Sequence, residues 1–256
     1  MTISTLFLAW QDPQSRSWFP IGRLTFDGEL YKFVYIEGAR NAQREANFSL
    51  LHSFPELTKE YKSIELFPPF ANRLMRPSRP DYNDYIQSLN IPRDRDDPIA
   101  IFSRSGGRKA TDTFEIFPCP KPDENGLFHI HFFAHGLRHI PQCSRDRINL
   151  LQPNEQLYLA NEFQNSYDSQ ALLLCTKDHH IVGYCPRYLA TDTLGICREK
   201  PDLVHVHVER INPAPTPLQS RLLCNMTAEW PQESYPFSER EYQSIVPNHQ
   251  VQTLTR

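Results

Sequence analysis

The stretch that decides the fold is residues 159–190, which read LANEFQNSYDSQALLLCTKDHHIVGYCPRYLA. A polar hinge at 164–168 precedes a short apolar run at 171–175, and a turn-like polar segment then leads into residues 181–184. Polar clusters around short apolar runs, with β-branched and aromatic residues after the turn, favour two strands over a buried helix. Because proline suits the first helical turn, Pro186 predicts a helix that runs to about Leu194.

The hinge brings Asn165, Tyr167 and Asp168 close together in the sequence. Such a set can stack on a ring and hydrogen-bond to sugar or terminal hydroxyl groups. Asn, Ser and Asp are also ordinary residues of a solvated β-turn. The residues by themselves therefore leave both a binding hinge and a plain turn open.

The hinge and the segment after it contain two motifs, Asn165-x-Tyr167-Asp168-x-x-Ala171 and Val182-Gly183-Tyr184-x-Pro186-Arg187-x-Leu189-Ala190. This pair resembles the signature of the HIRAN domain, and the resemblance covers residues 125–235. It implies a small β-barrel with two helices. The family is found beside helicase and nuclease modules, and its best-studied members bind the free 3′ end of single-stranded DNA.

The resemblance implies nucleic-acid-binding roles for seven residues, which are Arg138, His139, Asn165, Tyr167, Asp168, Tyr184 and Arg187. Tyr167 would stack on the terminal base, and Asp168 would accept a hydrogen bond from the 3′ hydroxyl. Asn165 would hold the turn or contact the sugar, and Arg138 would contact a phosphate. His139 stands where well-studied members have a stacking aromatic residue. Tyr184 and Arg187 could each contact DNA. Equally, Tyr184 could pack in the core and Arg187 could be a solvated charge at the start of a helix.

Length and composition indicate a globular chain. It has 256 residues, of which 39% are hydrophobic and 22% are charged, so two ordinary domains with real cores are possible. We expect no signal peptide and no membrane-spanning helix, because the first apolar stretch lacks a basic flank and breaks at Gln11. The six cysteines form no CxxC pair, which favours reduced thiols in a cytoplasmic protein.

The charge balance limits how the chain can bind nucleic acid. The formal net charge is −3, and residues 125–235 contain nine Lys and Arg against eleven Asp and Glu. A groove that follows a long strand through its phosphates needs a positive field. The composition therefore argues against strand tracking and is compatible with a pocket that recognises an end.

The amino-terminal part predicts a separate α+β module. Residues 1–36 alternate like short antiparallel strands with a hairpin turn at Asp27-Gly28, and helices are expected over 39–47 and 81–89. Two further strands are expected over 99–102 and 113–117. A polar linker at 121–126 divides the chain into domains at 1–120 and 125–235, with a polar tail at 236–256.

Residues 3–120 resemble the amino-terminal subdomain of HipA-type kinases. The matching pieces are Ile21-Gly22-x-Leu24, Tyr31-x-Phe33-x-Tyr35 and Leu66-Phe67-Pro68-x-Phe70-x-Asn72. The kinase body of that family does not follow, because the chain passes directly into the HIRAN-like segment. The resemblance implies a module for protein contacts and gives no support for phosphoryl transfer.

Catalytic and metal sites are not indicated by any recognisable motif. Nucleophile elbows, HExxH and kinase motifs are missing, so we expect neither catalytic residues nor a cofactor. His129/His131 and His205/His207 would each share a strand face, but no Cys or carboxylate completes a ligand spacing.

The sequence therefore predicts a non-enzymatic protein that recognises single-stranded DNA 3′ ends, in DNA repair or defence, with an unknown protein partner bound through residues 1–120. One alternative is an antitoxin-like regulatory protein that acts through the HipA-like module. A second is a metal-dependent nuclease that uses the histidine pairs.

Overall fold

The computed structural model describes residues 4–165, 168–230 and 235–246. The chain groups into two compact units, and neither is continuous in sequence. The first unit combines residues 1–74, 107–119 and 238–256, and the second combines 75–106 and 120–237. Each unit contains one sheet with helices, so the predicted α+β fold class is confirmed. No helix in the described part of the chain is long and apolar enough to cross a membrane.

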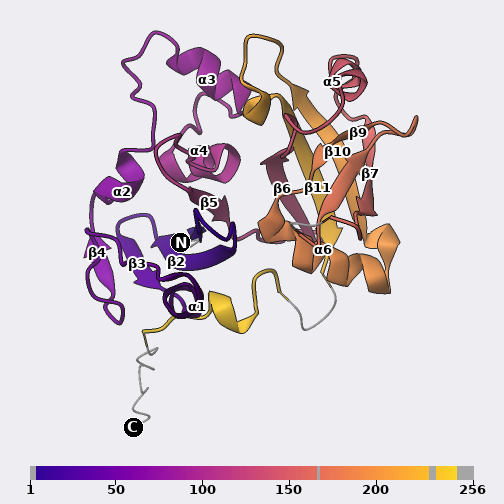
Figure 1. Ribbon diagram of the computed structural model, residues 1–256. Helices are drawn as coiled ribbons and strands as arrows, with labels where there is room; N and C mark the ends of the chain where they lie inside the picture. Colours follow the sequence, from indigo (N-terminus) through magenta and orange to yellow (C-terminus); the bar gives the residue numbers. More distant parts are fainter. Residues whose placement is uncertain (1–3, 166–167, 231–234, 247–256) are drawn as a thin grey trace. The chain divides into compact units, whose positions relative to one another are not determined.

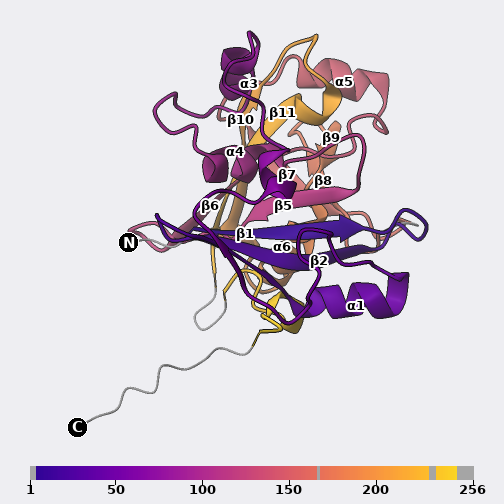
Figure 2. The same cartoon turned by 90° about the vertical axis from the view of Figure 1, so that its left-hand side faces the viewer.

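The first unit is built on a five-stranded antiparallel sheet with the order β4-β3-β2-β1-β5 (Figure 1). Its strands are β1 (Ser4–Gln11), β2 (Trp18–Phe26), β3 (Tyr31–Tyr35), β4 (Tyr61–Ser63) and β5 (Phe114–Pro118). Helix α1 (Glu37–Ala46) packs on β2 (Figure 2), and the short α2 (Pro68–Ala71) follows β4. The strands predicted in residues 1–36 and the helix predicted over 39–47 are confirmed.

Segments distant in sequence complete the first unit. The buried guanidinium of Arg73 donates to the Gly107 carbonyl at 2.8 Å and to the Asp112 carboxylate at 2.6 Å, which holds the segment leading into β5. From the carboxyl-terminal side, Tyr242 is buried with its ring 5.0 Å from that of Phe7. Ser244 forms a β-bridge with Ile36. The described part of the predicted polar tail thus contributes to the core of this unit.

Residues 99–102 were predicted to form a strand, and this prediction is wrong. They lie in helix α4 (Pro98–Ser105) of the second unit. The Asp97 carboxylate accepts hydrogen bonds from the backbone N–H groups of Ile99 and Ala100, and Gly106 ends the helix with a φ of 70°. These capping residues, together with proline at the first helical position, outweigh the strand preference of isoleucine and phenylalanine. The helix predicted over 81–89 is present as α3 (Tyr82–Ser88).

The second unit contains a six-stranded antiparallel sheet with the order β6-β11-β10-β7-β8-β9. Its strands are β6 (Leu127–Phe133), β7 (Gln156–Asn161), β8 (Leu172–Cys175), β9 (Ile181–Tyr184), β10 (Val204–Ile211) and β11 (Leu222–Glu229). Helix α5 (Gln142–Ile148) lies at one end of the sheet and α6 (Arg187–Glu199) at the other (Figure 1). The strands and turn predicted in residues 171–184 are confirmed, and the helix that starts after Pro186 extends past Leu194.

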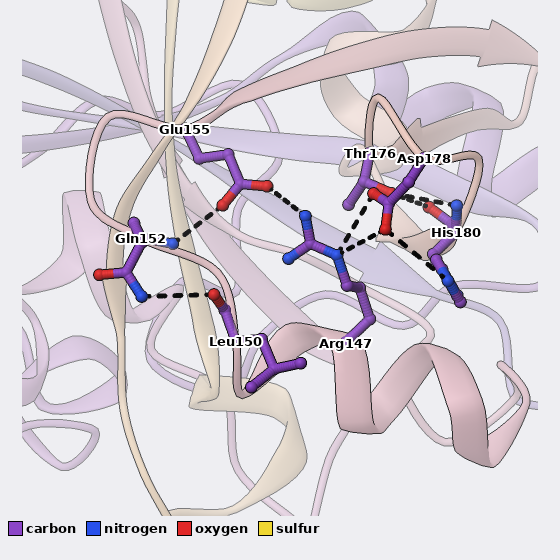
Figure 3. A network of polar contacts seen from close by, with 7 residues as sticks. All are labelled: Arg147, Leu150, Gln152, Glu155, Thr176, Asp178 and His180. Atoms are coloured by element: carbon purple, nitrogen blue, oxygen red, sulfur yellow. Dashed lines mark hydrogen bonds and ion pairs between the residues drawn. The ribbon is translucent and has the colours of Figure 1, made fainter.

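Arg147 connects three segments at the α5 end of the second unit (Figure 3). Its guanidinium donates to Glu155 at 2.6 Å and to Asp178 at 2.9 Å, and only 19% of its side chain is exposed. The hydrogen bonds from Arg147 and Thr176 hold the pKa of Asp178 well below its ordinary value. Arg147 thereby fixes α5 to the β8–β9 turn and to the segment before β7.

Replacing Tyr242 by Ala should destabilise the first unit by about 3 kcal/mol, because the change removes a buried ring and leaves a cavity beside Phe7. Chemical denaturation of the full chain measures the effect. Tyr235→Ala is the control, since Tyr235 is 68% exposed. Equal stability of the two variants would contradict a role for the carboxyl-terminal segment in this core.

Arg147→Ala should lower the melting temperature of the second unit by about 2–4 °C near pH 7. Arg145→Ala on the same helix should lower it less, because the Arg145 side chain bonds to Ile140 and Gln142, which are nearby in sequence. Since the pKa of Asp178 is lowered in the folded state, its stabilisation is complete above the ordinary carboxyl pKa and is lost as the pH falls below it. The difference in melting temperature between wild type and Arg147→Ala should therefore become smaller as the pH is lowered. A melting-temperature difference that stays constant below about pH 4 would contradict the role of the ion pair.

Candidate nucleic-acid interface

The first and last strands of the six-stranded sheet meet at His135 and Tyr184. The His135 N–H donates to the Tyr184 carbonyl at 2.9 Å, and the Tyr184 N–H donates to the His135 carbonyl at 3.0 Å. His135 lies two residues after β6 and Tyr184 ends β9, so these two bonds bring the sheet edges together at one point and the sheet forms a half-barrel. We call this junction, formed by residues 134–137 and 182–185, the seam.

Two glycines allow the chains to approach closely at the seam. Gly183 has a φ of 144°, and a Cβ atom on it would lie 3.0 Å from the Ala134 Cβ and from the His135 oxygen. Gly136 has a φ of 73°, and a Cβ atom there would lie 2.6 Å from Cδ2 of the Tyr184 ring. Both positions combine a backbone conformation that favours glycine with a lack of space for a side chain. The Tyr184 ring therefore packs directly on the Gly136 backbone.

Glu162 connects the hinge to the seam. The Asn165 side chain donates to the Glu162 carboxylate at 2.6 Å, and the Asn165 backbone N–H donates to the Glu162 carbonyl at 3.0 Å. Burial raises the pKa of Tyr184, and the negative charge of the nearby Glu162 carboxylate adds to this. Glu162 thus holds the start of the hinge, and its carboxylate lies near the Tyr184 side chain at the end of β9.

The end of the hinge is held by an ion pair with helix α6. Arg187 Nε lies 2.8 Å from Asp168 Oδ2, and the other Asp168 oxygen accepts from the Gln170 N–H at 3.0 Å. The Asp168 N–H in turn donates to the Asn165 side-chain oxygen at 3.0 Å. Since Arg187 is the first residue of α6, the pair fixes the hinge against the start of that helix.

Arg138 and His139 form a second, exposed pair that follows the seam. Arg138 Nε donates to His139 Nε2 at 2.9 Å, and both side chains face solvent. They lie two and three positions after Gly136, whose backbone contacts Tyr184. Their position places a guanidinium and an imidazole on the chain segment that leaves the seam.

The comparisons with known proteins assign the second unit's barrel. Residues 127–230 match the HIRAN domain family. This segment is a HIRAN domain. Among solved structures, a protein from Lactobacillus plantarum is 17% identical, with 40% of this chain and 97% of that chain covered and a TM-score of 0.31. The HIRAN domain of human HLTF is 18% identical, with 42% and 84% covered and a TM-score of 0.29. No curated protein sequence matches the chain.

Six of the seven residues predicted for the HIRAN domain site are described in the structure, and Tyr167 lies outside the described residues. Asn165, Asp168 and Arg187 form one connected group, and Glu162 links Tyr184 to it. Arg138 and His139 contact each other. Sequence reasoning missed Glu162, although an acidic residue three positions before a turn asparagine is a usable signal for such an anchor.

The histidine pairs of the HIRAN domain lie on strands that are not adjacent. His129 and His205 both pair with Thr227 on β11, which therefore separates them. Two strand spacings amount to about 10 Å, which is too far for the two pairs to share one metal ion. Among the described residues, no group of three or more His, Cys, Asp or Glu side chains could hold a metal ion.

Gly136→Ala should destabilise the HIRAN domain by about 1–3 kcal/mol more than Gly126→Ala, as measured by denaturant unfolding. Gly126 is the matched control, since its φ of 82° resembles that of Gly136 but a Cβ atom there meets nothing within 4 Å. Both variants bear the backbone strain, and only Gly136→Ala displaces the Tyr184 ring. Equal destabilisation would show that the contact between Gly136 and Tyr184 does not hold the seam.

Proposed function

We propose that the HIRAN domain of this protein binds single-stranded DNA at a free 3′ end. The observation that carries the proposal is the family match over residues 127–230. Within this segment the candidate residue Asp168 is joined to both Arg187 and Asn165. Well-studied HIRAN domains recognise such ends. In this proposal the chain binds without catalysis.

The roles of the residues follow from their contacts. Arg138 is exposed, and its guanidinium can hold a phosphate oxygen of the bound strand. Asp168 uses one oxygen for Arg187 and the other for the Gln170 N–H, and each carboxylate oxygen has a second lone pair for a 3′ hydroxyl. Asn165 holds the two ends of the hinge through Glu162 and Asp168. The proposal takes the stacking of Tyr167 on the terminal base from the family resemblance alone. His139 provides a second ring beside Arg138.

The pairing of carboxylates with cations supports end recognition by a domain that is not basic. Arg187 compensates the charge of Asp168, so a strand end that approaches the hinge does not meet an isolated negative charge. A terminal phosphate would add a second negative charge beside Asp168. The arrangement therefore favours a 3′ hydroxyl over a 3′ phosphate.

The first unit contributes a protein contact in this proposal. Support comes from the resemblance of residues 3–120 to the amino-terminal subdomain of HipA-type kinases. Because residues 238–246 complete its core, the unit should be tested within the full chain and not as a fragment that ends before them.

The decisive test compares oligothymidines that carry a 3′ hydroxyl or a 3′ phosphate, with affinity measured by fluorescence anisotropy. Wild type should prefer the hydroxyl end. Asp168→Asn should lose about 1 kcal/mol toward the hydroxyl end and lose less, or gain, toward the phosphate end. The ratio of the affinity for the 3′-hydroxyl strand to the affinity for the 3′-phosphate strand should therefore fall.

Arg187→Gln is the matched control, because it breaks the same ion pair and leaves the Asp168 carboxylate uncompensated. The preference for the hydroxyl end should then rise, in the opposite direction to Asp168→Asn. If both variants shift the ratio in the same direction, Asp168 acts only as a structural partner of Arg187. A wild-type protein with no preference for a free 3′ end would refute the proposed function.

A further inference from the structure

Phe163 is an exposed aromatic residue directly before the hinge, and none of the roles above uses it. Its side chain is 82% exposed, the highest value among the large apolar side chains in the described part of the chain. A phenylalanine in water forgoes the favourable burial of its ring, which suggests a function at this position.

The backbone beneath Phe163 is fixed. The Asn165 N–H donates to the Glu162 carbonyl at 3.0 Å and closes a turn around Phe163 and Gln164. The side chains of Asn165 and Glu162 are joined at 2.6 Å across the same turn. The Glu162 carboxylate also lies near the Tyr184 side chain at the seam. The ring is therefore presented from an anchored turn, which lowers the entropy lost when it binds a partner.

The polar surroundings of Phe163 favour one planar aromatic group as its binding partner over an extended protein surface. Its chain neighbours Glu162 and Gln164 are polar. The other exposed large apolar residues of the described chain are Ile64, Leu150, Tyr158 and Tyr235, of which Tyr158 on β7 is nearest in sequence, five residues before Phe163. Protein-docking surfaces need a contiguous apolar patch of a few hundred Å². A lone aromatic ring in a polar turn instead suits one nucleobase, because every base has a π-face and stacking tolerates polar surroundings.

We propose that Phe163 is a stacking platform for an upstream base of the bound strand, next to the terminal nucleotide that the hinge holds through Asp168. This inference rests on the proposed function and extends it. It assigns the site a second base contact and requires the ligand to have at least one nucleotide before the 3′ terminal one. A free mononucleotide lacks this contact.

The experiment uses the full-length protein and a short fluorescent oligothymidine with a free 3′ hydroxyl, together with strands in which one nucleotide near that end is abasic. Phe163→Ala should weaken binding of the intact strand by about 5- to 150-fold, the range for one base–aromatic stack. Phe163→Trp should keep the affinity, and Phe163→Leu should lose it. The melting temperatures should be unchanged, since the side chain is exposed.

For one abasic strand, the one that lacks the stacked base, wild type should bind as weakly as Phe163→Ala binds the intact strand. Wild type and Phe163→Ala should then bind this abasic strand equally well. If every abasic strand is weakened by Phe163→Ala as much as the intact strand, the ring does not stack on a base and the inference is wrong. An unchanged affinity of Phe163→Ala for the intact strand would also overturn it and would leave the ring to a protein contact. In either case, a wild-type protein that still prefers a free 3′ end would leave the proposed function standing. A wild-type protein without this preference would refute both the proposed function and the role of Phe163.

Discussion

Two backbone hydrogen bonds between His135 and Tyr184 determine the arrangement of the second unit. They join the edges of a six-stranded sheet, and they require the backbone at Gly136 and Gly183 to approach neighbouring groups too closely for any side chain. An open edge would leave unpaired N–H and C=O groups exposed to other chains. The bridge pairs these groups where the two edges meet and brings Gly136 against Tyr184, three residues before α6 begins.

The polar residues around the seam act as a connected set. Glu162 accepts from Asn165, while Asp168 accepts from Arg187. Each carboxylate therefore has a donor, which limits the cost of its partial burial. This local pairing compensates part of the slight excess of acidic residues in the domain. Long strands need a field from many cations, whereas one end needs only a few well-placed groups.

The first unit shows a different dependence on distant contacts. Its sheet forms from the amino-terminal hairpins, but Arg73 holds the segment at 107–112 and the segment at 238–246 supplies buried side chains. Residues 75–106 between these parts belong to the second unit, where α4 packs near β6. The chain therefore crosses between the units more than once.

The sequence by itself determined the features that depend on neighbouring residues. The apolar runs on both sides of a turn predicted β8 and β9, the Asp27-Gly28 turn predicted a hairpin, and Pro186 predicted the start of α6. The motif resemblance also named six candidate site residues that the structure describes, because those motifs are local. The strand predicted over 99–102 was wrong, since the Asp97 cap and Pro98 outweigh residue preference.

Only the tertiary structure decided the closure at His135 and Tyr184, the anchoring role of Glu162 and the exposure of Phe163. These depend on contacts between segments far apart in the chain, where packing and hydrogen-bond geometry, and not local propensity, select the arrangement.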